Sequence, residues 1–238
     1  MRQLPDPAIY EEEFRTTPWG AMIDAVVREV KTRTPCSGSL VDLMCGPGYL
    51  INKLAQERYD LNLFGIDSDT RFIDFARRNY RSCRIGFIEG DVFDWAPALG
   101  KDFDVITCTA GVHHLPYDKQ EPFLAKVVDI LTPDGVALIG DPYISDYNNE
   151  LERRFGASEL GDAFTTAAIR GGACDDVVKA AIDVMYNDIF GHEYKTSVRK
   201  MRPLLKKYFR IEDERFTWRP DPSKEYGDCL FILKKKGR

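Results

Sequence analysis

A glycine pair and an aspartate that could bind a ligand each follow an apolar run in the first part of the chain. In VDLMCGPGYL (residues 41–50), Gly46 and Gly48 allow a sharp turn that brings the backbone close to a ligand, and a following helix would direct its free N–H groups there. In GIDSD, Asp67 could accept hydrogen bonds from both hydroxyls of a ribose. The structural alternatives are a plain strand-to-helix turn and a helix N-cap, and we assign the cap to Asp69.

A third motif, EGDVFDW (residues 89–95), follows the next apolar run. Asp91 could accept a hydrogen bond from the exocyclic amine of adenine, and Val92 and Phe93 could flank the ring. Taken alone, Asp91 is equally well explained as a turn residue.

A fourth motif, TCTAGVHHLP (residues 107–116), contains two adjacent histidines. His113 or His114 could act as a general base, because histidine titrates near neutrality; the alternative is that they only shape the pocket. Asp141 and Tyr143, after a later apolar run, could line the same pocket and are further candidates for catalysis. We expect no metal site, because no further histidine and no CxxC pair supports one.

Apolar runs alternate with amphipathic patterns from residue 39 to residue 140. The expected strands cover 39–44, 61–66, 83–88, 103–109 and 135–140, and the expected helices 49–59, 70–80 and 119–131. Such an alternation indicates a parallel sheet covered on both faces, and right-handed crossovers make it doubly wound. The motifs therefore lie at the carboxyl edge of the sheet, where open α/β sheets bind ligands.

The remaining segments complete one Rossmann-like α/β domain over residues 1–238. Residues 1–17 are polar and read as irregular, and a helix follows from Trp19 to Val30. The α/β rhythm breaks after Asp141, and residues 146–190 carry only helical patterns, which predicts a helical lid inserted after the fifth strand. A helix over 197–209 and two strands, 210–218 and 228–236, then give a mostly parallel sheet of seven strands.

Composition narrows the classes of function. The chain has 238 residues and a formal net charge of -5, whereas duplex-binding proteins usually need a basic face, so a nucleic-acid substrate is not expected. The sequence contains no apolar run long enough to span a bilayer, and its first residues do not resemble a signal peptide. We therefore expect a cytoplasmic protein whose six cysteines are reduced.

Together, the four motifs resemble those of the class I S-adenosylmethionine (SAM)-dependent methyltransferases, in particular members that act on small molecules. VDLMCGPG is similar to the glycine-rich first motif of that family, GIDSD to its ribose-binding acid and GDVF to its adenine-binding acid. DVITCTAGVHHLP followed by LTPDGVALIG resembles its fourth strand, active-site loop, helix and fifth strand. The resemblance covers roughly residues 39–140 and implies the SAM cofactor, with S-adenosylhomocysteine (SAH) as product.

The resemblance also implies a role for each matching position. Asp42 would lie near the methionine amino group and reach it through water, and the glycine pair would lie behind the methionine part. The ribose would be bound by Asp67, with Ser68 beside it among the cofactor-binding residues. Backbone groups of Thr109 and Ala110 would receive the methionine ammonium group. Met44 departs from the pattern, since the family usually has glycine there, and its side chain would narrow the space under the cofactor.

The acceptor is expected to be a neutral or cationic small molecule. Between Asp141 and Lys195 eleven acids stand against five bases, and an acidic lid would repel anions, although these acids could also form a solvated helix face. Near the N-terminus, Tyr10, Phe14 and Trp19 could fold over the cofactor, as in similar enzymes, or pack as an edge helix.

Three alternative functions remain open. A nicotinamide-dependent dehydrogenase also needs glycines and an acid after the second strand, but its GxGxxG loop is missing and it has no use for Asp91. A non-catalytic SAM-binding or protein-interaction module would fit a degenerate cofactor loop, of which Met44 is the only hint. Methylation of RNA or protein would require a basic groove beside the site.

Overall fold

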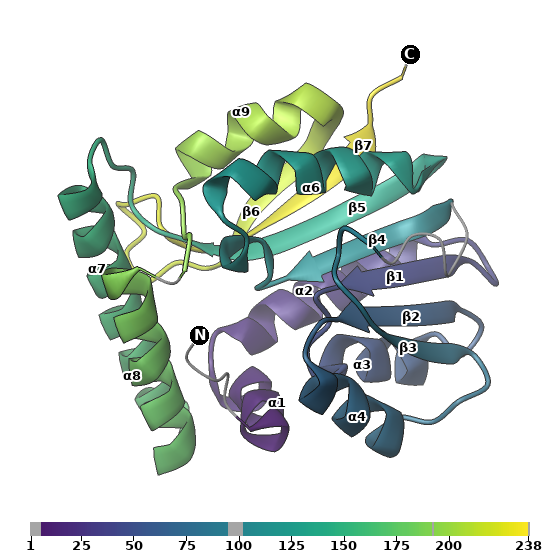
Figure 1. Cartoon of the computed structure of the whole chain (residues 1–238), viewed down its shortest axis with the longest axis horizontal. Helices are drawn as coiled ribbons and strands as arrows, with labels where there is room; N and C mark the ends of the chain where they lie inside the picture. Colours follow the sequence, from purple (N-terminus) through teal and green to yellow (C-terminus); the bar gives the residue numbers. More distant parts are fainter. Residues whose placement is uncertain (1–5, 95–101, 192, 238) are drawn as a thin grey trace.

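A seven-stranded sheet forms the centre of the computed structural model, which describes residues 6–94, 102–191 and 193–237 (Figure 1). The strand order is β3-β2-β1-β4-β5-β7-β6. The strands are β1 (Ser39–Leu43), β2 (Asn62–Asp67), β3 (Ile85–Glu89), β4 (Phe103–Thr109), β5 (Leu131–Tyr143), β6 (Phe209–Trp218) and β7 (Gly227–Lys235). The first five run parallel, and β7 is antiparallel to both β5 and β6. This confirms the expected doubly wound, mostly parallel Rossmann-like sheet.

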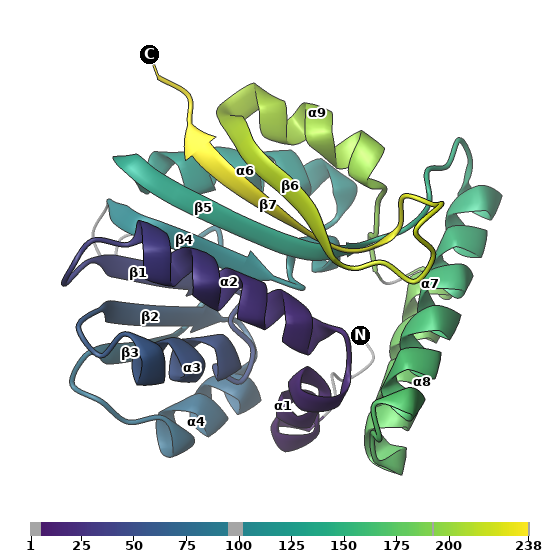
Figure 2. The ribbon, with the colours of Figure 1, turned by 180° about the vertical axis from the view of Figure 1, so that it is seen from behind.

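Helices cover both faces of the sheet (Figures 1 and 2). The helices α2 (Trp19–Arg33), α3 (Tyr49–Glu57) and α4 (Thr70–Asn79) lie on one face, and α6 (Tyr117–Asp129) and α9 (Val198–Tyr208) lie on the other. The strands are apolar on both sides, since Leu138 of β5 belongs to the core under α2 whereas Ile139 belongs to the core under α6 and α9. These helices cover the two faces of the sheet and leave its edge at the carboxyl ends of the parallel strands uncovered (Figures 1 and 2).

The N-terminal segment is a helix, so the expectation of an irregular stretch over residues 1–17 was wrong. Helix α1 (Pro7–Thr16) starts with Pro7 in its first turn, and the Asp6 side chain accepts a hydrogen bond from the Ala8 N–H as N-cap. Tyr10 and Phe14, one turn apart, are both 8% exposed. Their burial stabilises a helix whose other residues are mostly polar.

The insertion after the fifth strand is a helical hairpin, as the break in the α/β rhythm predicted. It consists of α7 (Glu150–Arg170), with Asn149 as N-cap, and α8 (Asp175–Phe190), which pack against each other. Both ends of the insertion lie together, since the Ile144 N–H donates to the Thr196 carbonyl over 3.1 Å. Helix α8 contacts α1, and both helices lie at the carboxyl edge of the sheet (Figure 2).

Element boundaries differ from the expected ones at two places that matter for the site. Strand β5 runs to Tyr143 and not to residue 140, and β3 begins at Ile85. The sequence also indicates a short segment, VFDWAPAL (residues 92–99), after the third strand, and from residue 95 onward it lies outside the described residues. Within the described ranges, none of the helices combines the length and the apolarity that crossing a bilayer requires.

Candidate active site

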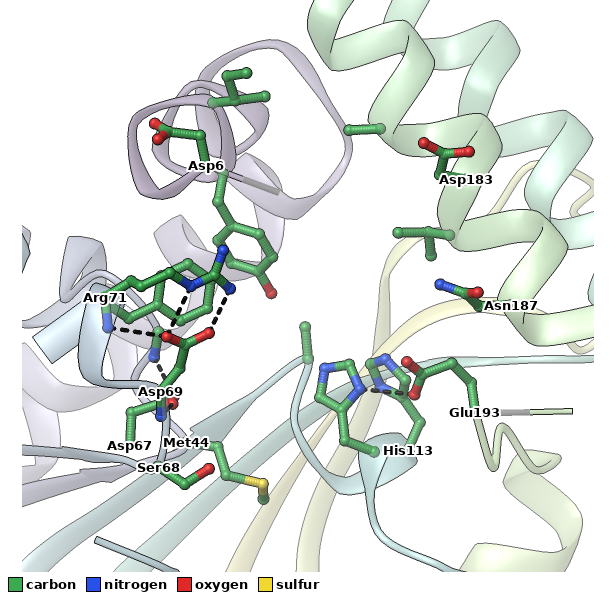
Figure 3. A pocket seen from close by; sticks show the side chains of 18 of the residues that line it. Asp6, Met44, Asp67, Ser68, Asp69, Arg71, His113, Asp183, Asn187 and Glu193 are labelled. Atoms are coloured by element: carbon green, nitrogen blue, oxygen red, sulfur yellow. Dashed lines mark hydrogen bonds and ion pairs between the residues drawn. The ribbon is translucent and has the colours of Figure 1, made fainter. Parts of the chain in front are cut away.

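A cavity of about 1280 Å³ lies at the carboxyl ends of β1, β2, β3 and β4 and extends to α8. Nine of the residues predicted to bind the cofactor or to act in catalysis line it: Met44, Gly46, Asp67, Ser68, Asp91, Val92, Ala110, His113 and His114. Figure 3 shows Asp67 and Asp69 on one side, with His113 and Glu193 opposite them. The cavity thus brings together residues that are far apart in the chain.

The glycine loop and the second strand meet at Asp67. Its carboxylate accepts a hydrogen bond from the Gly46 N–H over 2.8 Å and another from the Asp69 N–H over 2.9 Å. Burial raises the pKa of Asp67, and these two N–H groups oppose that shift. Asp69 is the N-cap of α4, as expected, since it accepts from the Arg71 N–H. Asp67 therefore ties the loop to the strand end while lining the cavity.

Gly48 begins α3 with a left-handed backbone (φ 85°). A Cβ at this position would lie 2.8 Å from the Phe87 ring, so a side chain would collide as well as strain the backbone. Gly48 does not line the cavity. It shapes the turn that places Gly46 there, and the Tyr10 ring lies 3.5 Å from where a Gly46 Cβ would be. Helix α1 therefore covers the glycine loop.

Met44 occupies a left-handed conformation (φ 56°), which explains why glycine suits this position. Its side chain lines the cavity and packs beside Gly111, where an added Cβ would lie 3.1 Å from the Met44 Cβ. Met44 thus takes up space at the floor of the cavity that a glycine would leave open (Figure 3).

Asp42 lies behind the loop and not in the cavity. It is 1% exposed, and Thr107 donates its hydroxyl to it over 2.7 Å. Burial raises the pKa of Asp42 to about 7, although the Thr107 hydrogen bond opposes the shift. Phe93 and Thr109 also lie outside the lining, whereas Asp91 is exposed and accepts the Phe93 N–H over 2.7 Å.

His113 is fixed by the buried Asp141. Its Nδ1 lies 2.9 Å from Asp141 Oδ1, and its backbone N–H donates to Oδ2 over 3.1 Å. Burial lowers the pKa of His113 and raises that of Asp141 to about 7. Asp141 does not line the cavity itself. It orients a neutral imidazole that does.

His114 is paired with Glu193, from the segment that follows α8. Its Nδ1 lies 2.7 Å from Glu193 Oε2. Burial alone would lower the pKa of His114, but the hydrogen bond to Glu193 outweighs burial and raises it. Burial would raise the pKa of Glu193, yet the hydrogen bond from His114 lowers it to about 2. The raised pKa of His114 and the lowered pKa of Glu193 both favour the charged forms of this pair at the cavity wall.

Tyr143 is not part of the cavity lining. It is 0% exposed and packs edge-on against Phe231, with 5.8 Å between the ring centroids, in the core beneath α6 and α9. Because β5 continues to Tyr143, this residue is still in the sheet and not in a loop that could reach the acceptor.

The hairpin and α1 contribute residues that sequence reasoning missed. On α8 these lining residues recur every three or four positions, as one helix face: Asp176, Lys179, Ala180, Asp183, Val184 and Asn187. The spacing is visible in the sequence, but only the fold shows which way that face points. Glu193 was counted among the acids of the insertion, without any signal linking it to His114. Asp6 and Ile9 line the cavity from α1. Of the three aromatic residues that the sequence offered as a cover for the cofactor, Tyr10 and Trp19 line the cavity and Phe14 does not.

Comparison with known proteins gives a family match over the region that holds the motifs. Residues 40–135 match the family model described as a methyltransferase domain. The trans-aconitate 2-methyltransferase of Paracidovorax citrulli is 28% identical over 141 residues, 58% of this chain and 50% of that protein. The dTDP-4-amino-2,3,4,6-tetradeoxy-D-glucose N,N-dimethyltransferase of Saccharopolyspora spinosa is 31% identical over 140 residues, 57% of this chain and 54% of that protein. The chain thus spans about half the length of the curated relatives it matches.

Among solved structures, the TehB-like SAM-dependent methyltransferase from Corynebacterium glutamicum has the same fold. It superposes with a TM-score of 0.52 at 20% identity, covering 92% of this chain and 94% of that one. This likeness concerns the fold, and the motifs and the family model supply the rest. The match of residues 40–135 to a methyltransferase domain, the methyltransferase relatives and the fold together support a class I SAM-dependent methyltransferase.

Proposed function

We propose that the protein transfers a methyl group from SAM to an O, N or C atom of a small-molecule acceptor. One observation carries the proposal: Gly46, Asp67, Asp91 and Ala110, from the ends of four parallel strands, line a single cavity. Single ligand pockets usually measure about 300–1,000 Å³. A cavity of about 1280 Å³ therefore has room for a donor and an acceptor together.

The residues present fit the cofactor. We assign Asp67 to the ribose hydroxyls, because each carboxylate oxygen can accept more than the one N–H it now receives. Asp91, with Val92, would hold the adenine, and Ser68 would lie beside the ribose. We assign the methionine part to the walls formed by Met44, Gly46 and Ala110, since all three line the cavity.

Four assigned residues would act from behind this wall. Asp42 and Gly48 hold the shape of the glycine loop, while Phe93 and Thr109 flank the lining positions. We therefore propose that these four residues support the cofactor site without touching the cofactor. Tyr143 receives no catalytic role, because it is enclosed in the core.

The far end of the cavity would receive the acceptor. Residues 146–190 would act as its lid within a single domain, because the cavity-facing side of α8 forms one wall. Seven carboxylates and two cationic side chains line the described cavity. This excess of negative charge favours a neutral or cationic acceptor over an anionic one.

The chemistry asks little of the protein beyond alignment. SAM supplies a methyl group on a sulfonium, which is a good leaving group, so the residues must orient the acceptor and exclude water. An acceptor that carries a proton needs a base. His113 is neutral and held by Asp141, so its imidazole can accept a proton, whereas the His114–Glu193 pair can hold a cationic acceptor nearby.

The names of the two relatives support a small acceptor, because one refers to an acid and the other to an amino sugar. We also place the enzyme in the cytoplasm, since its six cysteines, all of them described, are unpaired.

Calorimetry with SAM and SAH, followed by methyl transfer from labelled SAM to a panel of small amines, phenols and carboxylic acids, tests the proposal. We expect both cofactor forms to bind and an amine or phenol to be labelled. The Asp67→Asn variant should bind SAH more weakly, by about 1–3 kcal/mol. Folded protein that binds neither form would overturn the proposal.

A further inference from the structure

His113, His114 and Glu193 form a cluster at the wall of the cavity. Each offers one ligand atom, and these atoms all lie within 4.8 Å of one another. We infer that this cluster binds a divalent transition-metal ion of the zinc, iron or cobalt type, with open coordination positions facing the acceptor. The sequence predicted no metal site because Glu193 lies 79 residues from His114, and only the fold brings it to the histidines.

The chemistry of the donors selects this class of ion. Two imidazoles and one carboxylate suit zinc, iron, cobalt and nickel, whereas magnesium and calcium prefer oxygen ligands alone. Three protein ligands leave one to three positions open, as in metal sites that bind a substrate. All three residues line the cavity, so those positions are reachable by a ligand there.

The surroundings of His113 match those of a metal-binding histidine. Such a residue almost always gives its second ring nitrogen to a carboxylate or carbonyl, which fixes its tautomer. Asp141 is hydrogen-bonded to Nδ1 of His113 and accepts a hydrogen bond from the backbone N–H of His113. The contact with Asp141 therefore does not involve Nε2. Two hydrogen bonds to one buried carboxylate fix the orientation of His113 more firmly than a residue that only lines a pocket needs.

The segment that carries Glu193 is held equally firmly. The Tyr194 N–H donates to the His113 carbonyl over 2.7 Å, which links the two halves of the cluster through the backbone. Lys195 forms a buried ion pair with Asp188 of α8 over 2.6 Å. The two residues that follow Glu193 are therefore both anchored, which gives its backbone the rigidity that a coordination site needs.

Only the role of the ion in methyl transfer rests on the proposed function; the binding of the ion does not. An ion here would offer its open positions to an oxygen or nitrogen of the acceptor and hold that group beside the methyl donor, and His113 would then be a ligand of the ion and not a base. It would exchange the present hydrogen bond between His114 and Glu193 for coordinate bonds to the ion. Metal binding itself can be measured without any acceptor, so the two proposals fail separately.

The test uses the full chain after treatment with a chelator. The exposed Cys36, Cys83 and Cys174 are replaced by serine, because free thiols would also bind the probe ions. Zinc(II) and cobalt(II) are titrated by calorimetry, and cobalt(II) also by its visible absorption, with magnesium(II) as the negative control. SAH calorimetry and circular dichroism on each protein report folding and the cofactor site.

We expect one strong site per chain for cobalt(II) and zinc(II) and none for magnesium(II). Glu193→Gln, which keeps the shape of the side chain, and His114→Ala should each weaken binding by at least about 100-fold, the upper end of what the loss of an outer partner costs. Glu57→Gln, a carboxylate exposed on α3, is the matched control and should bind like the parent.

Each result separates the two proposals. Metal binding that is absent, or equal in Glu193→Gln and in the parent, overturns the metal site. SAH binding in that same protein leaves the methyltransferase proposal standing. The opposite pair of results, metal bound and neither SAM nor SAH bound, supports the site and overturns the proposed function.

Discussion

Met44 combines a strained backbone with a position under the proposed cofactor. A left-handed conformation costs a residue other than glycine about 1–2 kcal/mol, and Met44 adopts it at φ 56°. Its side chain packs between the loop and Gly111, which recovers part of this cost. Met44 thus keeps the left-handed backbone that suits glycine at this position, and its side chain reduces the free volume at the floor of the cavity.

Replacing Met44 by glycine should therefore separate strain from volume. We expect Met44→Gly to bind SAH more tightly, because the floor widens, while its free energy of unfolding stays within about 1 kcal/mol of the parent, since relieved strain offsets lost packing. Met44→Ala keeps the Cβ and should be less stable than Met44→Gly. Urea unfolding and calorimetry measure both. Weaker SAH binding by Met44→Gly would show that the side chain supports the cofactor.

The His114–Glu193 pair predicts a pH-dependent stability. The raised pKa of His114 gives stability that is complete below its unfolded value of 6.5 and is lost as pH rises through the folded value. The pKa of Glu193, lowered from 4.5 to about 2, gives stability that is present above pH 4.5 and lost as pH falls toward 2. Both contributions are therefore complete only between pH 4.5 and 6.5.

Comparing the chelator-treated parent with Glu193→Gln isolates this effect, since the buried His113 is common to both. The His114 side chain is 32% exposed, so screening limits the difference in free energy of unfolding to about 1 kcal/mol. We expect that difference to be largest near pH 5–6 and to shrink toward alkaline pH in denaturant unfolding curves. A difference that grows from pH 6 to pH 9 contradicts the pairing.

At the scale of elements, two helices that do not belong to the sheet layers close the cavity. Helix α1 covers the glycine loop through Tyr10, whose ring centroid lies 5.2 Å from that of Phe72 and 5.7 Å from that of Trp19. Helix α8 contributes a face of alternating acidic, basic and small residues and is buried mainly against α7. We therefore expect α8 to be the more mobile of the two walls.

Hydrogen exchange with and without SAH tests this difference. Amides of α8 (Asp175–Phe190) should exchange more slowly once the cavity is filled, because ligand contacts restrict the hairpin. Amides of α9, which covers the other face of the sheet, serve as the internal control and should not change. Equal exchange of α8 in both states would mean that the hairpin is a rigid wall and not a lid.

At the scale of the whole molecule, the sequence predicted the sheet well, because strand and helix patterns are local, and several of the residues it assigned to the cofactor line one cavity. It missed α1, whose signal was Asp6 followed by Pro7 and the buried pair on one helix face. It placed Tyr143 in the site because the strand was expected to stop at residue 140. Glu193 could not have been predicted, since its approach to His114 depends on how the hairpin folds back.

The charge of the molecule gives a further prediction that needs no acceptor. The chain carries a net charge of -5, and carboxylates outnumber lysine and arginine side chains in the lining of its cavity. SAM is a cation through its sulfonium, whereas SAH is uncharged overall, so SAM should be attracted more strongly at low salt. Raising ionic strength from about 0.01 M to about 0.15 M should weaken SAM binding more than SAH binding in calorimetry. Equal salt dependence would rule out steering by the cavity.

The hydrogen bond between Ile144 and Thr196 also bears on how acceptor range can change. It joins the two points where the hairpin leaves and rejoins the sheet, so the distance to be bridged is the same whatever lies between them. Segments inserted between neighbouring points disturb the parent fold least. The end of the cavity that we assign to the cofactor is lined from the ends of β1 to β4, outside the hairpin. Under that assignment, a hairpin grafted in with a different inner face should change which acceptor is bound and leave cofactor binding unchanged.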